Sequence, residues 1–383
     1  MIPYSKQSIN NIDIKHVKDA LKSKFLTQGP LTNKFEKKIA KFTNSRHAIT
    51  FNSASSALML ACKVLNLKKN DIAWTVPNTY AATANAILHS GLKLDFIDID
   101  SNSYNISIKK LKKKLILAKK KKKLPKLLIP IHFAGLPCDL KTISKLSKKY
   151  KFKIIEDASH ALGAKYNNEK IGSCKYSEMC IFSFHPVKTI TTGEGGAITT
   201  NDPSYEKLLR AYRSGGIVKN KRDLIKKSKP GWYYEQHYLG YNLRLNEIQA
   251  ALGVSQLNRI NKFYHLRKKI SDRYDKYFRN LPLSLPLKKT NLKSTYHLYV
   301  VRLNGGAIKR DQLYNKLKKD KIETNLHYIP LHFHPFYKKE KHRFKNLEES
   351  KLYFETALSL PIFPDLKIKE QIIIIKKIQK YFS

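Results

Sequence analysis

Short apolar runs alternate with stretches of helical periodicity over the first 200 residues, and this alternation constrains the fold more than any other feature. Strands are expected at residues 48–51, 73–76, 94–97, 127–131, 153–155 and 180–182. Helices are expected between several of them, at residues 55–65, 83–88 and 140–150. Such alternation is typical of an α/β protein with a mostly parallel sheet flanked by helices. Ligands of these sheets bind at the carboxyl ends of the strands.

The pattern changes near residue 245, and this change predicts a second domain. Residues 246–277 read as one long helix, followed by Pro-punctuated strands around residues 296–303. Helices are then expected at residues 309–319 and 369–382. We therefore expect a large domain over residues 1–245 and a smaller C-terminal α+β domain over residues 246–383.

The charge of the chain is strongly positive, but its distribution favours a solvated surface. Lys and Arg number 74 against 29 Asp and Glu, which gives a formal charge of +45 in 383 residues. Most of the basic residues are Lys and they are spread from end to end, whereas sequence-reading proteins favour clustered Arg. In the densest run, Lys109–Lys126, the residues Leu111, Leu115 and Ile116 predict the apolar stripe of a surface helix. The alternative is a polybasic arm for nucleic acid or acidic lipid; we expect neither nucleic acid nor membrane as a partner.

The cysteines and the apolar runs predict a cytoplasmic protein. Cys62, Cys138, Cys174 and Cys180 are scattered without a CxxC pair, which fits a reducing compartment rather than a disulfide framework. No signal peptide is evident, and the longest aliphatic run, Ile372–Ile375, is far too short for a membrane span.

Several chemistries find no support in the sequence. There is no GxxxxGK[ST] loop and no GxSxG motif. Residues 192–196, TGEGG, are similar to a dinucleotide-binding loop, but a strand rather than a helix is expected after them, at residues 197–200. His327, His332 and His334 are close in sequence, but without a Cys pair or HExxH motif they do not favour a metal site.

After these exclusions, the remaining candidates for catalytic chemistry are polar residues at the ends of two predicted strands. Asp157 follows the strand at residues 153–155, and Lys188 lies shortly after the strand at residues 180–182. An acid and a lysine at neighbouring strand ends can be a plain ion pair. The alternative is a pyridoxal phosphate site, in which the lysine carries the cofactor as a Schiff base and the aspartate keeps the pyridine nitrogen protonated.

Candidates for the other cofactor contacts are also present. Residues 52–57, NSASSA, follow a strand and open a helix, so their backbone N–H groups and hydroxyls suit a phosphate. A plain serine N-cap is the alternative for this segment. Tyr80, shortly after Pro77, is a candidate to lie on the pyridine ring; as an isolated aromatic it would belong to the core.

These motifs together resemble those of the DegT/DnrJ/EryC1/StrS family of nucleotide-sugar aminotransferases. The likeness spans essentially the whole chain and includes, in order, TQGP (27–30), NSASSAL (52–58), PNTYAATAN (77–85), EDASHALG (156–163), SFHPVKTITTGEGG (183–196), YNLRLNEIQAA (241–251) and SLP (359–361). The resemblance implies the fold of pyridoxal phosphate-dependent aspartate aminotransferases (type I).

The resemblance also implies a role for individual residues. Lys188 would carry the cofactor, Asp157 would pair with the pyridinium, and His160 would lie beside the ring. The remaining implied contacts are phosphate binding by Ala54, Ser55 and Ser183, ring stacking by Tyr80, a phosphate contact from the other subunit by Asn242, and an approach to the nucleotide-sugar by Thr27 and Gly29. A homodimer with shared active sites follows from the implied role of Asn242.

The implied reaction is transamination, because a dehydrating branch of the family carries histidine in place of the lysine. The expected substrates are L-glutamate as amino donor and a nucleotide-linked 4-keto-6-deoxy sugar, UDP-linked and on the way to pseudaminic acid. A GDP- or dTDP-linked sugar, or amination at C3, remains open. Ser214-Gly215-Gly216 departs from the Ser-His-Gly of many relatives, and residues 217–239 look longer than in some of them.

Overall fold

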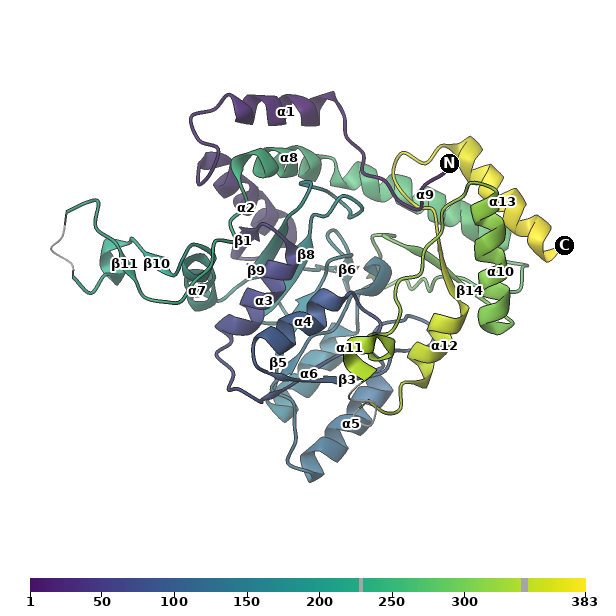
Figure 1. The fold of residues 1–383 in the computed structure, drawn as a ribbon, viewed down its shortest axis with the longest axis horizontal. Coiled ribbons are helices and arrows are strands. Elements are labelled where there is room, and N and C mark those ends of the chain that lie inside the picture. Colours follow the sequence, from purple (N-terminus) through teal and green to yellow (C-terminus); the bar gives the residue numbers. More distant parts are fainter. Residues whose placement is uncertain (227–229, 339–343) are drawn as a thin grey trace.

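A seven-stranded sheet forms the centre of the molecule in the computed structural model, which describes residues 1–226, 230–338 and 344–383 (Figure 1). Its strand order is β1-β9-β8-β5-β4-β2-β3. The strands are β1 (His47–Phe51), β2 (Ile72–Thr75), β3 (Lys93–Phe96), β4 (Leu127–Leu128), β5 (Lys153–Asp157), β8 (Met179–Ser183) and β9 (Gly196–Thr200). Strand β9 is antiparallel to β1 and β8, and the other pairs are parallel. The expectation of a mostly parallel sheet is confirmed, as is the strand after the TGEGG segment.

Helices flank this sheet (Figure 1). They are α2 (Pro30–Thr43), α3 (Ala54–Val64), α4 (Ala81–His89), α5 (Ile108–Lys120), α6 (Leu140–Tyr150) and α7 (Pro203–Arg213). Helix α1 (Asn11–Leu21) packs instead against α8 (Glu247–Asn258). Helix α3 packs against α4, α7 and four strands of the sheet, and α5 packs against α6. Because α3 begins directly after β1, its N-terminus lies at an end of the sheet.

The lysine-rich run folds as predicted, with one error. Helix α5 buries Leu111, Leu115 and Ala118, so the run is the solvent face of a packed helix. Ile116 was expected in the apolar stripe, but it is 51% exposed. Consecutive residues of a helix point in directions about 100° apart, so Ile116 cannot share the buried face with Leu115.

The prediction of one long helix over residues 246–277 is wrong in one respect, because this segment forms two helices. Helix α8 (Glu247–Asn258) ends at Arg259, and α9 (Ile260–Phe278) begins directly after. The Arg259 Nη1 lies 2.5 Å from Asp13 Oδ2, and its guanidinium carbon lies 4.7 Å from the centre of the Phe263 ring. These contacts with α1 and α9 accompany the break.

The C-terminal part has its own sheet and its own core. Strands β12 (Leu283–Ser284), β14 (Tyr299–Leu303) and β15 (Ala357–Leu360) pair in the order β12-β14-β15. The helices here are α10 (Gly306–Lys319), α11 (Pro335–Lys338), α12 (Glu348–Thr356) and α13 (Ile368–Phe382). Residues of α9, α10, α13, β14 and β15, joined by Ile2, form an apolar cluster separate from that of the large sheet. Other buried residues of the C-terminal part, such as Val300 and Tyr353, belong to the cluster of the large sheet. The division into domains at residues 245 and 246 stays a prediction.

Short elements complete the fold. A small sheet joins β13 (Leu292–Lys293), β6 (Lys165–Tyr166) and β7 (Glu169–Lys170). Short 3₁₀ helices lie at Phe133–Gly135, Lys221–Asp223 and Leu331–Phe333. Within the described ranges, none of the helices combines the length and the apolar character needed to cross a membrane.

The described residues of the segment 217–239, here called the arm, project from the body of the molecule (Figure 1). The arm contains the antiparallel strands β10 (Ile217–Val218) and β11 (Glu235–Gln236). Its described residues include four largely exposed apolar side chains: Ile225, Trp232, Tyr234 and Leu239. Glycine is required at its base, because Gly216 has φ +74° and a Cβ there would lie 1.8 Å from the Tyr238 carbonyl oxygen.

Candidate active site

The carboxyl ends of β5 and β8 lie side by side and carry the predicted site residues. Asp157 is the last residue of β5, Ser183 is the last residue of β8, and Lys188 follows in the next loop. A cavity of about 520 Å³ opens at this end of the sheet. The predicted residues that line it are Ala54, Ser55, Tyr80, Asp157, His160, Ser183 and Lys188.

The carboxylate of Asp157 is buried and held in one orientation. Thr83 Oγ1 in α4 donates a hydrogen bond of 2.7 Å to Asp157 Oδ2. The other oxygen, Oδ1, accepts bonds from the backbone N–H and the hydroxyl of Ser159, at 3.1 and 2.6 Å. A carboxylate fixed on both oxygens is pre-oriented toward its partner in the cavity. The role of Thr83 was not predicted, although it lies within the PNTYAATAN motif.

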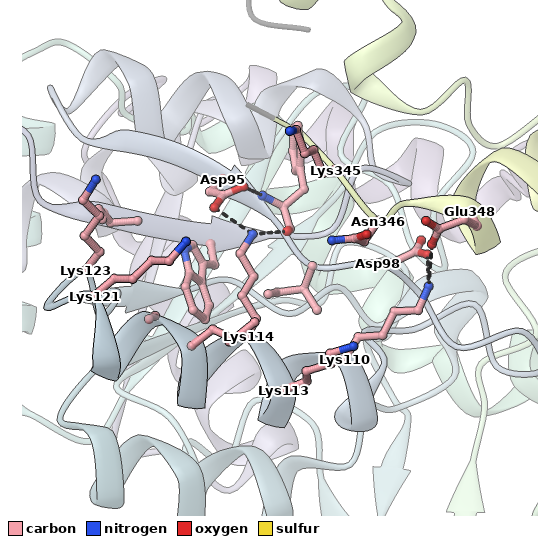
Figure 2. Close-up of a pocket in the computed structure, with 16 residues that line it drawn as sticks. Asp95, Asp98, Lys110, Lys113, Lys114, Lys121, Lys123, Lys345, Asn346 and Glu348 are labelled. Carbon is pink, nitrogen blue, oxygen red and sulfur yellow. Dashed lines mark hydrogen bonds and ion pairs between the residues drawn. The ribbon is translucent and has the colours of Figure 1, made fainter. Parts of the chain in front are cut away.

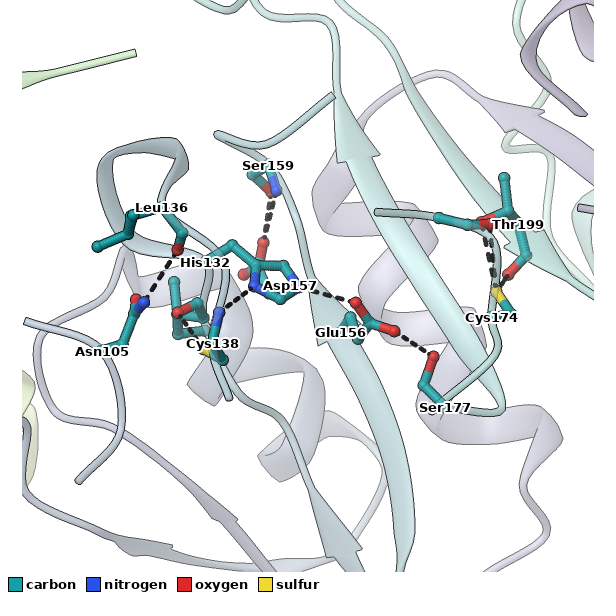
Figure 3. A network of polar contacts seen from close by, with 12 residues as sticks. Asn105, His132, Leu136, Cys138, Glu156, Asp157, Ser159, Cys174, Ser177 and Thr199 are labelled. Carbon is teal, nitrogen blue, oxygen red and sulfur yellow. Dashed lines mark hydrogen bonds and ion pairs between the residues drawn. The ribbon is translucent and has the colours of Figure 1, made fainter. Parts of the chain in front are cut away.

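A buried polar network also holds the end of β5 in place (Figure 3). The N–H of Cys138 donates to His132 Nδ1 at 3.0 Å, so the ring proton is on Nε2, which donates to Glu156 Oε2 at 2.8 Å. Ser177 Oγ donates to the other oxygen of Glu156. The N–H of His132 donates to the Asp157 carbonyl oxygen at 3.0 Å. This network ties β5 to the loop after β4, and nothing in the sequence pattern identified it.

The cavity changes the acid–base behaviour of the Lys188 amine. Burial disfavours the ammonium form and lowers the pKa of Lys188 to about 8, against the opposing attraction of the Asp157 carboxylate. An amine with this pKa is neutral in about a tenth of the molecules at pH 7, far more often than an ordinary lysine. It can therefore act as a nucleophile and as a proton carrier.

Histidines of the cavity are held in the neutral form. Burial, with Lys188 and His327 nearby, lowers the pKa of His160 well below its usual value. His160 Nε2 lies 3.1 Å from the Tyr328 hydroxyl, and its ring centre is 4.3 Å from that of His297. His297, His327 and Tyr328 come from the C-terminal part of the chain and were not predicted to line this site. Among the described residues, no three side chains of metal-ligating type are grouped.

One end of the cavity is suited to an anion. Ser53 caps α3 by accepting a bond from the Ser56 N–H at 3.1 Å, and the first N–H groups of the helix have no partner within it. Gly196 allows β9 to approach this turn, because a Cβ on it would lie 2.6 Å from Ala54 Cα. The residues fit pyridoxal phosphate: an anion site at α3, a lysine, a fixed carboxylate, and the ring of Tyr80, which is 66% exposed.

Three predicted residues do not line the cavity. Thr27 is exposed, and Gly29 is buried against Glu247, whose carboxylate accepts the N–H groups of Leu31 and Thr32 at the start of α2. Asn242 is exposed and pairs with Ser214 at the base of the arm. Contacts of these residues with substrate or with a second subunit stay predictions.

The main sheet has a single reversed strand, and Asp157 is held in one orientation at its strand ends beside Lys188, whose pKa is lowered to about 8. This combination defines a pyridoxal phosphate-dependent aminotransferase. The chain belongs to the DegT/DnrJ/EryC1/StrS aminotransferase family, whose model matches residues 7–379.

Similar proteins agree with this class. The chain is 37% identical over 372 residues to the UDP-4-amino-4,6-dideoxy-N-acetyl-beta-L-altrosamine transaminase of Campylobacter jejuni, which covers 97% of this chain and 94% of that protein. Helicobacter pylori PseC, an aminotransferase of pseudoaminic acid biosynthesis, has a TM-score of 0.91 at 31% identity, covering 100% and 99% of the two chains. The PLP form of the Streptococcus pneumoniae sugar aminotransferase Spr1654 has a TM-score of 0.89 at 27% identity and covers 100% of both chains.

Proposed function

We propose that this enzyme aminates a nucleotide-linked 4-keto-6-deoxy sugar, with a UDP carrier and L-glutamate as amino donor, on the way to pseudaminic acid. The observation that carries the proposal is the convergence of Lys188, Asp157 and the α3 N-terminus on one cavity. The similarity to the Campylobacter jejuni and Helicobacter pylori enzymes supports the choice of sugar and nucleotide.

The residues of the cavity would hold the cofactor as follows. Lys188 would be its point of attachment, and the α3 N-terminus with Ser55 and Ser183 would bind its phosphate. Asp157 would keep the proton on the pyridine nitrogen, and Tyr80 would cover one face of the ring. When bound, pyridoxal phosphate supplies the electron sink that allows an amino acid to lose its α-hydrogen as a proton.

Lys188 would also move the proton of the reaction. Its Nζ would accept the proton from the α-carbon of L-glutamate in the first half-reaction and return a proton to the sugar carbon in the second. A pKa of about 8 suits both directions, because the same amine has to accept and release a proton near neutral pH. The neutral histidines His160 and His297 would shape the cavity without adding charge near Lys188.

We further propose a homodimer with shared active sites in the cytoplasm. The arm supports the dimer, because it carries exposed Trp232 and Tyr234 away from the body of its own chain, and aromatic residues are enriched at interfaces. Asn242, at the base of the arm, would reach the cofactor phosphate of the second subunit, and Thr27 and Gly29 would lie near the nucleotide-sugar. All four cysteines are free and buried, which fits a reducing compartment.

Absorption spectroscopy tests both half-reactions. Purified protein with pyridoxal phosphate should show a visible cofactor band that bleaches with L-glutamate and returns with the UDP-linked 4-keto sugar. Matched GDP- and dTDP-linked sugars should restore it at least tenfold more slowly. Lys188→Ala should remove turnover in a dimer that still unfolds cooperatively. Retained turnover in this variant, or faster recovery with another nucleotide, would refute the assigned residue or the assigned substrate respectively.

A further inference from the structure

A second cavity lies at the edge of the main sheet and shares no lining residue with the active site (Figure 2). It measures about 510 Å³, which is within the range of small-molecule sites. One wall is the face of α5 that carries Lys110, Lys113 and Lys114, and Lys121 follows directly after this helix. The opposite wall is formed by β3 and the residues around Asn346.

The rim of this cavity, here called the edge cavity, carries more lysine side chains than acidic side chains. Six lysines line it against the three carboxylates of Asp95, Asp98 and Glu348. Lys110 pairs with Asp98 at 2.5 Å and Lys114 with Asp95 at 2.7 Å. Within the described ranges, the four lysines left without an acidic partner are Lys113, Lys121, Lys123 and Lys345. Their ammonium groups leave an excess of positive charge at the mouth.

The floor of the edge cavity is aromatic and contains an unsatisfied donor. Trp74 and Phe96 are each 2% exposed and line the cavity. Lys114 Nζ lies 5.1 Å from the centre of the Trp74 ring, and the Phe344 ring centre lies 4.7 Å from that of Phe96. The indole Nε1–H of Trp74 is buried and has no hydrogen-bond partner among the described residues. Buried donors in folded proteins are nearly always paired, so an acceptor oxygen beside Trp74 would complete the site. An apolar floor with a few directed polar groups is typical of organic-ligand sites.

We propose that the edge cavity binds a small organic phosphate with a planar body, of the size of a nucleoside diphosphate. The phosphates would lie against Lys113, Lys121 and Lys123, which act as point charges for phosphate oxygens. The planar body would pack over the apolar floor and place an acceptor near the Trp74 Nε1–H. This site is independent of the sugar substrate proposed above.

The chain contains its own reporter for the experiment. It has two tryptophans, so Trp232→Phe leaves Trp74 as the single indole fluorophore. The holoenzyme of this variant is titrated with UDP, with uridine and with inorganic phosphate, under excitation at a wavelength that UDP does not absorb. Each titration is repeated after Lys113→Ala/Lys121→Ala. The matched control is Lys119→Ala/Lys120→Ala, which removes the same charge from exposed positions of α5 outside the cavity.

The proposal predicts a saturable change in Trp74 emission with UDP. Affinity should fall at least tenfold in the Lys113/Lys121 variant and less than twofold in the control variant. Inorganic phosphate and uridine should each bind at least tenfold more weakly than UDP, because each lacks one half of the ligand. No saturable response to UDP, equal loss in both variants, or equal affinity for UDP and inorganic phosphate would each overturn the proposal.

Discussion

Thr83 and Asp157 are 74 residues apart, yet the Thr83 hydroxyl donates a 2.7 Å hydrogen bond to the Asp157 carboxylate at the end of β5. A hydrogen bond to a charged group contributes about 1.5–3 kcal/mol. Thr83→Val should therefore lower kcat/KM by about tenfold to a hundredfold, because the carboxylate loses one of the bonds that orient it. Steady-state kinetics measures this loss. Thr83→Ser retains the hydroxyl and should stay within about threefold of the parent enzyme; equal activity of Thr83→Val would contradict the role.

The pKa of Lys188 predicts how cofactor attachment depends on pH. Attachment requires the neutral amine, so its rate in the apoprotein should rise about tenfold per pH unit below pH 8 and level off above it. A lysine with an ordinary pKa would still gain rate at pH 10. Stopped-flow absorbance after mixing apoprotein with pyridoxal phosphate distinguishes the two profiles. In Asp157→Asn the plateau should begin at lower pH, because the Asp157 carboxylate raises the pKa of Lys188; a shift to higher pH would contradict this account.

Glu36 predicts a pH-dependent contribution to stability. Burial opposes its ionisation, but Arg213 and Arg210, at 2.7 and 2.8 Å, hold the pKa of Glu36 below its usual value. Stability from a lowered pKa is present above the unfolded value of about 4.5 and is lost as the pH falls through the folded value. Glu36→Gln should lower the free energy of unfolding by about 3–5 kcal/mol at pH 7, and by less below pH 4.5.

Urea denaturation at both pH values measures this difference. Glu169→Gln is the control, because Glu169 pairs with Lys175 on the surface and should cost less than about 1 kcal/mol at either pH. If the loss in Glu36→Gln were the same at pH 7 and pH 4, its ionisation would not be the source.

The tight packing of Gly216 at the base of the arm predicts that a substitution there weakens association of the subunits. Gly216→Ala places a Cβ against the Tyr238 carbonyl oxygen at positive φ, so the arm must shift. Gly215→Ala shares the positive φ but meets only the Ile217 side chain, at 3.4 Å. We expect Gly216→Ala to weaken the proposed dimer at least tenfold and Gly215→Ala to weaken it less, as measured by sedimentation equilibrium. Equal dimer affinity of Gly216→Ala and the parent enzyme would show that the arm is not part of the interface.

The sequence predicted best what depends on local pattern. Apolar runs bounded by polar turns located all seven strands of the main sheet, and the polar residues after two of them located Asp157 and Lys188. Contacts between distant segments could not be predicted. The helix break at Arg259 coincides with a contact to Asp13, 246 residues away in sequence, and no periodicity within residues 246–277 reports it. His297 and Tyr328 line the cavity because the C-terminal part folds back over the strand ends, and neither lies in a motif.

The reversed strand β9 has a consequence for how the chain folds during synthesis. Strand β1 lies at one edge of the main sheet and pairs there with β9, whose residues emerge about 150 residues later. Until Gly196–Thr200 leaves the ribosome, the apolar strand His47–Phe51 has no native partner in the main sheet. Pairings between such distant segments slow folding and leave strand edges exposed. The nascent first half of this enzyme therefore carries an unpaired strand edge. A chaperone that shields exposed strands would act most usefully before residues 196–200 are synthesised.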